Sequence, residues 1–495
     1  MRRLLFIAGM VLGLQAMPLS AKTVTGRVTD GRLGLPGVSV YPDRLRHPWP
    51  TPLPPIATTD VEGSFILELA DSDDVLVVEK SGWQRDLVPQ AEWQAPIALA
   101  PAPEHRVEKA LVVRLDFPDE ASAISDDTLR ERFFYRQPGV ASVANYFFEV
   151  SKGSLEFEEG AILHLVDREH AAPRRDEDRG ALVRWVIAQL KGLKLGDLDR
   201  VNNRTGALVP DGKPDHLWII APGPSQTITT NHAHHSPISF LERLPWDREC
   251  KWSALFLPED TPLGNLVHEA FHAMGEHRVD DFYLDESHPL TAGIWDLMDV
   301  GMYRGWDRHH PEMGPWFADV AYSPSQPMGW TRAELWYGGR FRETVTEERV
   351  TGRSWTGWLD VLERAPGRLP QRLIVPDLRK PGCFWELNVR RPWGFDRGRI
   401  GDRWGVGHEG LVVAAIDSSK LTPDEPQGPV HVVDAHPGSA QPPLPRAPNG
   451  RWELDDAAFN LGPGETPKGH DGPLSWEVLA VDEFGRMRVR VRRAR

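Results

Sequence analysis

Cysteine, long apolar runs and an excess of basic residues are what this sequence has least of. Only two of its 495 residues are cysteines, Cys250 and Cys383, so at most one disulfide can form within the chain. A bridge and two free thiols are equally consistent with the sequence. The interior contains no run approaching the roughly 20 apolar residues that a membrane-spanning helix needs. The formal net charge of −14 argues against a nucleic-acid partner, because phosphate binding requires a basic surface.

The length and composition indicate a multidomain globular protein. A chain of 495 residues is too long for a single hydrophobic core, and about two to four domains are expected. Hydrophobic residues make up 40% of the chain and charged residues 26%, and these proportions predict an ordinary globular protein.

The N-terminus has the three-part layout of a secretory signal peptide. Residues 1–21 begin with a methionine and two arginines, continue with an apolar stretch from Leu4 to Leu14, and end in small residues at Ala21. This pattern predicts Sec-dependent export, cleavage after Ala21, and a secreted or periplasmic mature protein. An N-terminal membrane anchor is the alternative, although the apolar stretch is short for a span.

Residues 22–100 alternate short apolar strands with turn residues. Val24, Val28, Val38 and Val40 keep a period of two around Gly-Leu-Pro-Gly, which predicts antiparallel strands joined by a tight turn. The patterns "V-x-G-x-V", "G-V-x-V" and "T-x-D-x-x-G-x-F" in this stretch resemble those of the carboxypeptidase regulatory-like domain. The resemblance implies a β-sandwich without chemistry of its own. The segment "APIALAPAPEHR" that follows is expected to be a linker, because proline and alanine replace the periodicity.

Beyond residue 105 the pattern becomes mixed α and β. "KALVVRLDFPD" and "DHLWIIAPGP" predict buried strands, and "SKGSLEFEEGAILHLV" predicts a hairpin of two strands. Helices are expected after Ser125, whose side chain is a candidate cap, and within 140–150 and 180–193. Strand signals return beyond residue 340, and the terminal "RMRVRVRR" alternates as a half-exposed strand does. The expected fold class is multidomain α+β, with domains over 22–100, 105–340 and 341–495.

The segment "TPLGNLVHEAFHAMGEHRVDD" (261–281) carries a candidate metal site. Thr261-Pro262 predicts the start of a helix, with the threonine hydroxyl as its cap. On such a helix His268 and His272 project from the same face and can share one metal ion. Glu269 is then placed to act as a general base toward a water that the metal makes more acidic. H-E-x-x-H alone also arises by chance, so the sequence downstream of it is needed to distinguish a metal site from a chance match.

Downstream, "GIWDLMDVGMYRGW" places Met298 in a predicted tight turn. Its "WDLMD" closely resembles the phrase found in the immune inhibitor A family of secreted bacterial metallopeptidases, which is metzincin-like. Further similar blocks follow in the family's order between about 107 and 465: "VVRLDFPD", "NYFFEVSKGSLEFEEGAI", "LWIIAPGP", "PMGWTRAELW", "CFWELNVRRPWGFD" and "EGLVVAAIDSS". The resemblance implies a metzincin-like α/β zinc-peptidase domain followed by a C-terminal β-rich domain. The implied function is a secreted zinc endopeptidase acting on protein or peptide substrates.

Carried over residue by residue, the resemblance implies specific roles. His268 and His272 would bind the catalytic zinc, Glu269 would be the general base, and Met298 would form the turn below the metal. Structural calcium is common in the family, although no calcium-loop spacing stands out in the acidic loops here. Tyr303, just past the turn, can stabilise a tetrahedral oxyanion by a hydrogen bond, or can simply be a packed tyrosine.

The third zinc ligand departs from the family pattern. Arg278 stands where the family has aspartate, and arginine cannot bind zinc. If the loop is two residues longer, Asp280 becomes the ligand, and this is the favoured assignment. His277 is the better intrinsic donor but lies one residue short of the usual spacing, Asp281 is a third candidate, and Glu286 is a distant fourth.

Other histidines and another class of function remain as alternatives. The histidines of "NHAHHSP" and "DRHHPE" can form a second metal site, although adjacent histidines rarely converge on one ion. Because Arg278 replaces a ligand, the chain can also be a secreted binding or adhesion protein built on a catalytically disabled peptidase scaffold.

Overall fold

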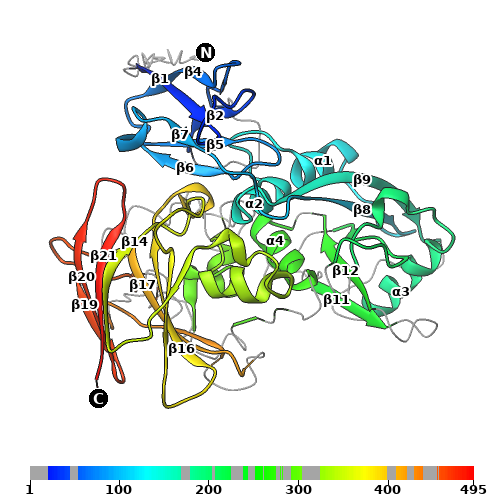
Figure 1. Cartoon of the computed structure of the whole chain (residues 1–495). Coiled ribbons are helices and arrows are strands. Elements are labelled where there is room, and N and C mark those ends of the chain that lie inside the picture. Colours follow the sequence, from blue (N-terminus) through cyan, green and yellow to red (C-terminus); the bar gives the residue numbers. More distant parts are fainter. Residues whose placement is uncertain are drawn as a thin grey trace, which may run out of the picture.

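The protein is a multidomain α+β molecule with several β-sheets and few helices (Figure 1). A computed structural model describes residues 21–44, 54–168, 179–202, 207–223, 238–243, 251–259, 261–274, 279, 281–282, 291–303, 324–397, 409–420, 428–438, 454 and 456–494. The expected fold class is confirmed at this level. Among the described helices, none has both the length and the apolar character needed to cross a membrane. Apart from Ala21, the predicted signal peptide lies outside the described residues.

The N-terminal unit is a sandwich of two small sheets. Its elements are β1 (Ala21–Thr29), β2 (Ser39–Pro42), β3 (Ala57–Thr58), β4 (Ser64–Ala70), β5 (Val75–Glu79), β6 (Asp86–Pro89), the 3-10 helix η1 (Gln90–Glu92) and β7 (Ile97–Ala98). One sheet has the order β4-β1-β7 and the other the order β3-β2-β5-β6. Buried side chains from both sheets form one hydrophobic cluster between them.

The pairing of the first strands differs from the prediction. Val24 and Val28 of β1 share a core with Val38 and Val40, which lie just before and within β2, as their alternation indicates. However, β1 pairs with β4 and β7, whereas β2 pairs with β3 and β5. A period of two tells which side chains point inward but not which strand is the neighbour. The expected hairpin is therefore two strands of facing sheets, and part of the expected linker is the strand β7.

The central unit is a five-stranded sheet with helices on both faces. Its elements are β8 (Arg106–Asp116), α1 (Asp126–Phe134), α2 (Val143–Val150), β9 (Leu155–Val166), α3 (Arg179–Gln189), η2 (Gly196–Leu198), β10 (His216–Ala221), β11 (Ile238–Arg243), β12 (Lys251–Pro258) and α4 (Leu263–Ala273). The strand order is β11-β12-β10-β8-β9, in which β11 alone is antiparallel to its neighbour. Alternate strand side chains join two separate clusters, so α1, α2 and α4 cover one face and α3 the other.

Local sequence signals are confirmed at α1 and corrected at β9. Ser125 caps α1 as expected, because its Oγ accepts a hydrogen bond from Thr128 N at 3.1 Å. Residues 151–166 do not form a hairpin but contribute one long strand, β9, parallel to β8. Gly160 has no partner in this ladder, and a Cβ there would lie 2.8 Å from Ala110 O. Gly160 permits a bulge in a continuous strand at this point.

The C-terminal unit consists of two further sheets. Its strands are β13 (Glu347–Arg349), β14 (Ser354–Leu359), β15 (Arg372–Pro376), β16 (Cys383–Arg390), β17 (Gly410–Asp417), β18 (Val430–Val432), β19 (Lys468–Asp471), β20 (Leu474–Val481) and β21 (Met487–Arg493). Short helical turns connect it to the central unit: η3 (Gly293–Trp295), η4 (Val300–Tyr303), η6 (Thr331–Leu335), η7 (Trp336–Gly339) and η8 (Arg342–Thr344). A further turn, η9 (Gly394–Arg397), lies between β16 and β17. The sheet orders are β13-β15-β16-β17-β18 and β14-β21-β20-β19.

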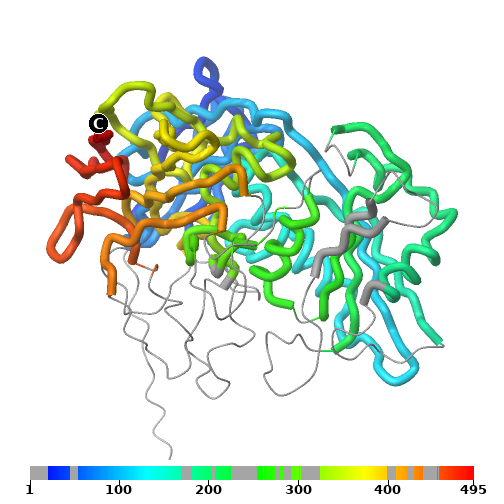
Figure 2. The backbone as a smooth tube through the Cα atoms, turned by 90° about the horizontal axis from the view of Figure 1, so that it is seen from below, coloured from blue at the N-terminus to red at the C-terminus, as the bar shows by residue number. Residues whose placement is uncertain are grey.

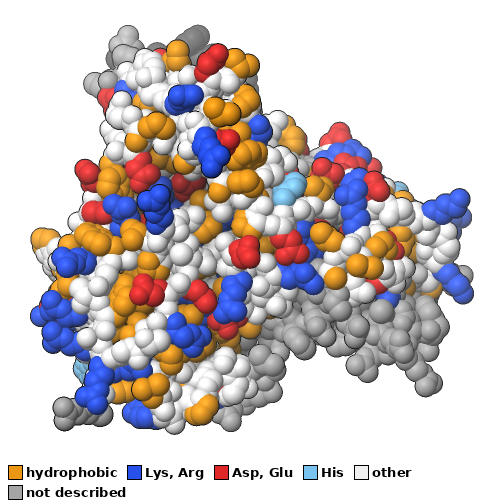
Figure 3. Space-filling model, viewed as in Figure 1, with side chains coloured by type: hydrophobic (Ala, Val, Ile, Leu, Met, Phe, Trp, Pro, Cys, Tyr) orange, Lys and Arg blue, Asp and Glu red, His pale blue; other side chains and the backbone are white. Residues whose placement is uncertain are grey.

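The half-exposed terminal strand is confirmed. Met487, Val489 and Val491 of β21 are buried between the two C-terminal sheets, and the arginines that alternate with them face outward. Basic side chains gather on this side of the molecule, over β19, β20 and β21 (Figure 3). Elsewhere on the same face, charges of both signs are interspersed.

The C-terminal sheet that contains β17 and the central unit share one core. Val412, Ala414 and Ile416 of β17 belong to the same hydrophobic cluster as the helices that cover the central sheet. The view from below shows the C-terminal strands at one end of the molecule and the central sheet with α3 at the other (Figure 2). The candidate helix α4 lies between them, so its surroundings come from both units.

Buried charges attach the N-terminal sandwich to the rest of the molecule. Arg85, which follows β5, lies 2.6 Å from Glu149 of α2, and both side chains are at most 2% exposed. Glu149 also accepts a hydrogen bond from Phe395 N in η9. Asp43, just after β2, accepts a bond from Gly394 N at 2.8 Å. All three units therefore meet at buried carboxylates.

We expect Arg85→Met to lower the free energy of unfolding by about 3–5 kcal/mol, because Glu149 then keeps a buried charge without this counter-ion. Arg44→Met in the same sandwich is the matched control. Arg44 pairs with Asp73 at 2.9 Å but is 42% exposed, and such pairs contribute about 0–1 kcal/mol. Urea unfolding followed by tryptophan fluorescence measures both effects. Equal losses for the two variants would contradict the role given to Arg85.

Candidate metal centre

Helix α4 presents the two histidines from a buried position. Leu266, Val267, Ala270 and Phe271 supply an apolar stripe that packs into the core, and the helix contacts α2, β11, β12 and η4. The helix begins at Leu263 with Pro262 as its cap residue. Thr261 was expected to cap the helix, but its hydroxyl donates to Pro258 O at the end of β12 instead. The helix predicted from the sequence is thus present, with a different start.

Three potential ligand atoms converge beside this helix. The Nε2 atoms of His268 and His272 lie 3.1 Å apart. Asp281 Oδ1 lies 2.9 Å from the first and 3.1 Å from the second. Both rings are only 2% exposed, while Asp281 is half-buried. Within the described part of the chain, this is the one group of three or more His, Cys, Asp or Glu side chains with metal-site spacing.

Backbone carbonyl groups orient both histidine rings. His268 Nδ1 lies 2.9 Å from Leu297 O, and His272 Nδ1 is in short contact with Val279 O. A carbonyl oxygen can only accept, so each Nδ1 carries the hydrogen and donates it. In the neutral rings, each Nε2 therefore presents a lone pair toward the other ring and toward Asp281.

This arrangement fits a cation. Asp281 Oδ1 is buried, and its polar neighbours among the described residues are the two ring nitrogens. Three electron-pair donors this close need a positive charge among them, which either a proton on a ring nitrogen or a metal ion supplies. Two imidazoles and one carboxylate form a donor set that suits zinc. The residues present therefore fit a divalent metal ion.

The electrostatics of the three groups are strongly coupled. Burial alone lowers the pKa of His268, but the close contact with Asp281 and the charge of its carboxylate outweigh burial and raise this pKa to about 9. Burial raises the pKa of Asp281, yet the two histidines outweigh it and hold this pKa far below its usual range. At neutral pH Asp281 is thus ionised and His268 is protonated, so a metal ion would take the place of the proton that His268 holds.

Backbone contacts close a circuit around the centre. Val279 O contacts the ring of His272 on α4. Phe282 N, just beyond Asp281, donates to Met298 O at 2.9 Å and so ties this segment to the predicted Met turn. Leu297 O, one residue before Met298, returns the circuit to His268. The contacts run from α4 to Val279, from Phe282 to Met298, and from Leu297 back to α4, so the three ligand candidates are held relative to one another.

The structure describes some of the other predicted site residues fully and others only in part. Met298 is fully buried within a turn, as expected. Glu269 is half-buried on α4 beside His268. Tyr303 ends η4, but its side chain lies outside what the structure describes. Of the candidate third ligands, the structure describes Asp281, which lies beside the two histidines.

Several candidates fall on residues that the structure does not describe. These are Asp280, His277, Glu286 and the histidines of "NHAHHSP" and "DRHHPE", and Arg278 is not described either. The described residues provide no second cluster that would support structural calcium. Cys383 is a half-buried free thiol whose pKa is raised by burial, while Cys250 lies outside the described residues.

The residues that sequence reasoning missed act mainly through their backbone. Leu297 and Val279 contribute carbonyl oxygens, for which the side-chain sequence carries no signal. Asp296 and Asp299 were visible in the "WDLMD" phrase, but nothing in the sequence indicates that both are completely buried.

Comparison of the sequence with known families and with curated proteins finds no match. No protein-family model matches the chain, and no curated protein matches it either. The resemblance to immune inhibitor A peptidases therefore rests on the sequence blocks quoted above, and the geometry of the candidate centre is a separate observation.

Metal titration of single variants distinguishes the candidates for the third ligand. We expect Asp281→Asn to weaken zinc binding by more than the roughly 10–100-fold that is typical for loss of a residue that only supports a ligand. Asp280→Asn is the matched control, since it removes the same charge one residue away and should leave the affinity within about threefold. Zinc competition with a chromophoric chelator measures both constants. Loss of zinc in Asp280→Asn or in His277→Ala, with Asp281→Asn unaffected, would reverse the assignment.

Proposed function

We propose that the protein is a secreted zinc-dependent endopeptidase of metzincin-like type, similar to the immune inhibitor A peptidases, which hydrolyses protein or peptide substrates. The observation that carries this proposal is the convergence of His268 Nε2, His272 Nε2 and Asp281 Oδ1 beside a helix that also bears Glu269. The proposal of secretion rests on the sequence of residues 1–21.

The chemistry divides between the metal and the protein. Zinc held by these three groups would supply Lewis acidity, which lowers the pKa of a water to about 7 and polarises a substrate carbonyl. Glu269 is suited to accept the proton of the attacking water and return it to the leaving amine. Its half-buried position next to His268 limits its exposure to solvent while keeping it beside the centre.

A sheet edge beside the helix suits an extended peptide. β11 is the outermost strand on its side of the described central sheet, runs antiparallel to β12, and contacts α4. An extended chain can pair with such an edge through main-chain hydrogen bonds. Binding of this kind depends little on side chains and holds an internal peptide bond near the helix, which favours endopeptidase activity.

Glu269→Gln is expected to lower the rate of casein hydrolysis by about 100- to 10,000-fold, because it removes the proton acceptor. The variant should still bind zinc, since it keeps His268, His272 and Asp281. Glu131→Gln, an exposed glutamate on α1, is the control for loss of charge and should keep full activity. The mature chain is assayed with and without a zinc chelator.

Two outcomes would count against the proposal in different ways. Unchanged activity in Glu269→Gln would contradict the mechanism. A folded wild-type protein without bound zinc and without activity would contradict the enzyme altogether and support a binding or adhesion protein on a disabled scaffold.

A further inference from the structure

One short segment holds two of the three candidate metal ligands. Residues 295–299, named here the support loop, contribute Leu297 O to His268 Nδ1 at 2.9 Å. The next carbonyl, Met298 O, accepts a hydrogen bond from Phe282 N at 2.9 Å and so fixes the backbone next to Asp281. A shift of the support loop would therefore disturb contacts that position both His268 and Asp281.

A completely buried carboxylate holds the support loop itself. Asp296 Oδ1 accepts a hydrogen bond from Met298 N at 2.8 Å, which closes the turn. Asp296 Oδ2 accepts from Met328 N at 2.8 Å and from the Thr331 hydroxyl at 2.7 Å. Both carboxylate oxygens are thus used, one within the loop and one toward the segment that leads to η6.

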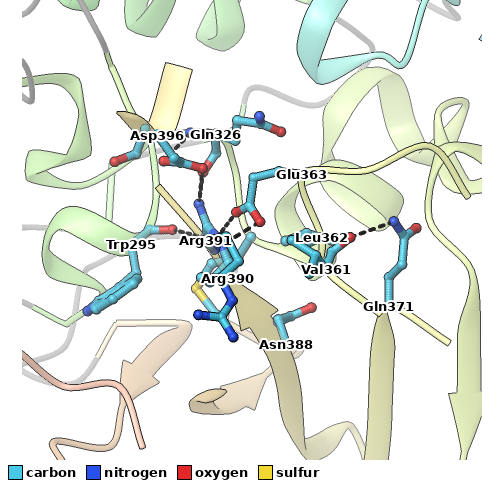
Figure 4. A network of polar contacts seen from close by, with 12 residues as sticks. Trp295, Gln326, Val361, Leu362, Glu363, Gln371, Asn388, Arg390, Arg391 and Asp396 are labelled. Atoms are coloured by element: carbon cyan, nitrogen blue, oxygen red, sulfur yellow. Dashed lines mark hydrogen bonds and ion pairs between the residues drawn. The ribbon is translucent and has the colours of Figure 1, made fainter. Parts of the chain in front are cut away.

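A second anchor comes from the C-terminal unit. Arg390, the last residue of β16, donates to Trp295 O at 2.7 Å, at the start of the support loop. The same guanidinium contacts Glu363 at 2.6 Å and Asp396 at 2.8 Å. Figure 4 shows Arg390 between these two carboxylates, with Trp295 on one side. Both carboxylates fix the orientation of the guanidinium plane, because its donors form a rigid fork.

Arg390 connects the C-terminal sheet to the candidate centre through the support loop. The path runs from Arg390 to Trp295 O, through the loop to Leu297 O, and on to His268. Arg390 is 3% exposed, Glu363 is fully buried and Asp396 is 2% exposed, so water does not compete for these bonds. The two anchors belong to different units and act on the same loop.

We propose that Asp296 and Arg390 are positioning residues that set the geometry of the metal centre, so that the C-terminal sheet is part of the site. This inference rests on the proposed function, since it requires a metal at His268, His272 and Asp281. It goes further by assigning to the C-terminal unit a role in metal coordination. A residue of purely structural importance would alter stability without altering how the metal is held.

The test uses cobalt(II) in place of zinc on the full mature chain, because the visible absorption of cobalt reports its coordination. We expect Asp296→Asn to weaken cobalt binding by about 10- to 100-fold, the range seen for residues that orient metal ligands. The intensity and position of the absorption bands should change as well. Thr331→Val removes one donor to the same carboxylate and should have a smaller effect in the same direction.

Tyr337→Phe is the matched control for the hydroxyl deletion. The Tyr337 hydroxyl also donates to a fully buried carboxylate, that of Glu108, at 2.5 Å. It lies in η7, outside the circuit that surrounds the centre. Its removal should lower the melting temperature but leave the affinity for cobalt and the spectrum unchanged.

Arg390→Lys tests the second anchor. Lysine keeps the positive charge but lacks the planar fork that reaches Glu363, Asp396 and Trp295 O together. We expect weaker cobalt binding with altered bands, as in Asp296→Asn. If either of these variants fails to fold, Thr331→Val still tests the loop.

The outcomes separate the two proposals. Wild-type affinity and wild-type bands in Thr331→Val and in every folded variant of Asp296 and Arg390 would overturn the positioning role alone. If the wild-type protein binds no cobalt, or if His268→Ala binds it equally well, the proposed function fails, and this inference fails with it.

Discussion

The burial of Arg390 between Glu363, Asp396 and the carbonyl of Trp295 is the constraint on which the arrangement of the units depends. A guanidinium withdrawn from water is costly unless each of its donors finds an acceptor. Apolar contacts between the central unit and β17 provide much of the attraction but tolerate small displacements. The hydrogen bonds of Arg390 are directional and do not tolerate such displacements. They therefore determine where the C-terminal sheet lies against the support loop.

The same argument applies where the N-terminal sandwich joins the other units. Glu149 of α2 meets Arg85 from the sandwich and Phe395 N from the C-terminal unit. Gly394 allows this approach, because its φ is +63° and a Cβ atom would lie 1.9 Å from Glu149 Oε1. Loss of the sandwich would leave these carboxylates with fewer partners, so the sandwich is bound by more than its connection in the chain.

Regular periodicity made much of the fold predictable, whereas strand partners and loop geometry were not. The four-residue spacing of His268 and His272 indicated their common direction, and the capping of α1 by Ser125 was local chemistry. The partners of β1 and β2 depend on how two sheets face each other, and Gly160 suits a bulge as well as a turn. Neither the strand partners nor the choice between bulge and turn is decided by residues close in sequence. The choice among candidates for the third ligand shows the same limit, because Asp280 and Asp281 have identical side chains and no period governs the segment that carries them.

The position of Asp281 depends on the support loop, and the support loop depends on the buried carboxylate of Asp296. The segment around Asp281 is held at Val279 by His272 and at Phe282 by Met298, whose own turn is closed by Asp296. Burial raises the pKa of Asp296 to about 6, even though Met298 N, the Thr331 hydroxyl and Met328 N all donate to the carboxylate and oppose the shift. An ionised carboxylate under such a penalty is stable only while all its donors stay in place. The loop that orients His268 and Asp281 is consequently confined to a narrow range of positions, which is the property a metal centre with defined coordination requires.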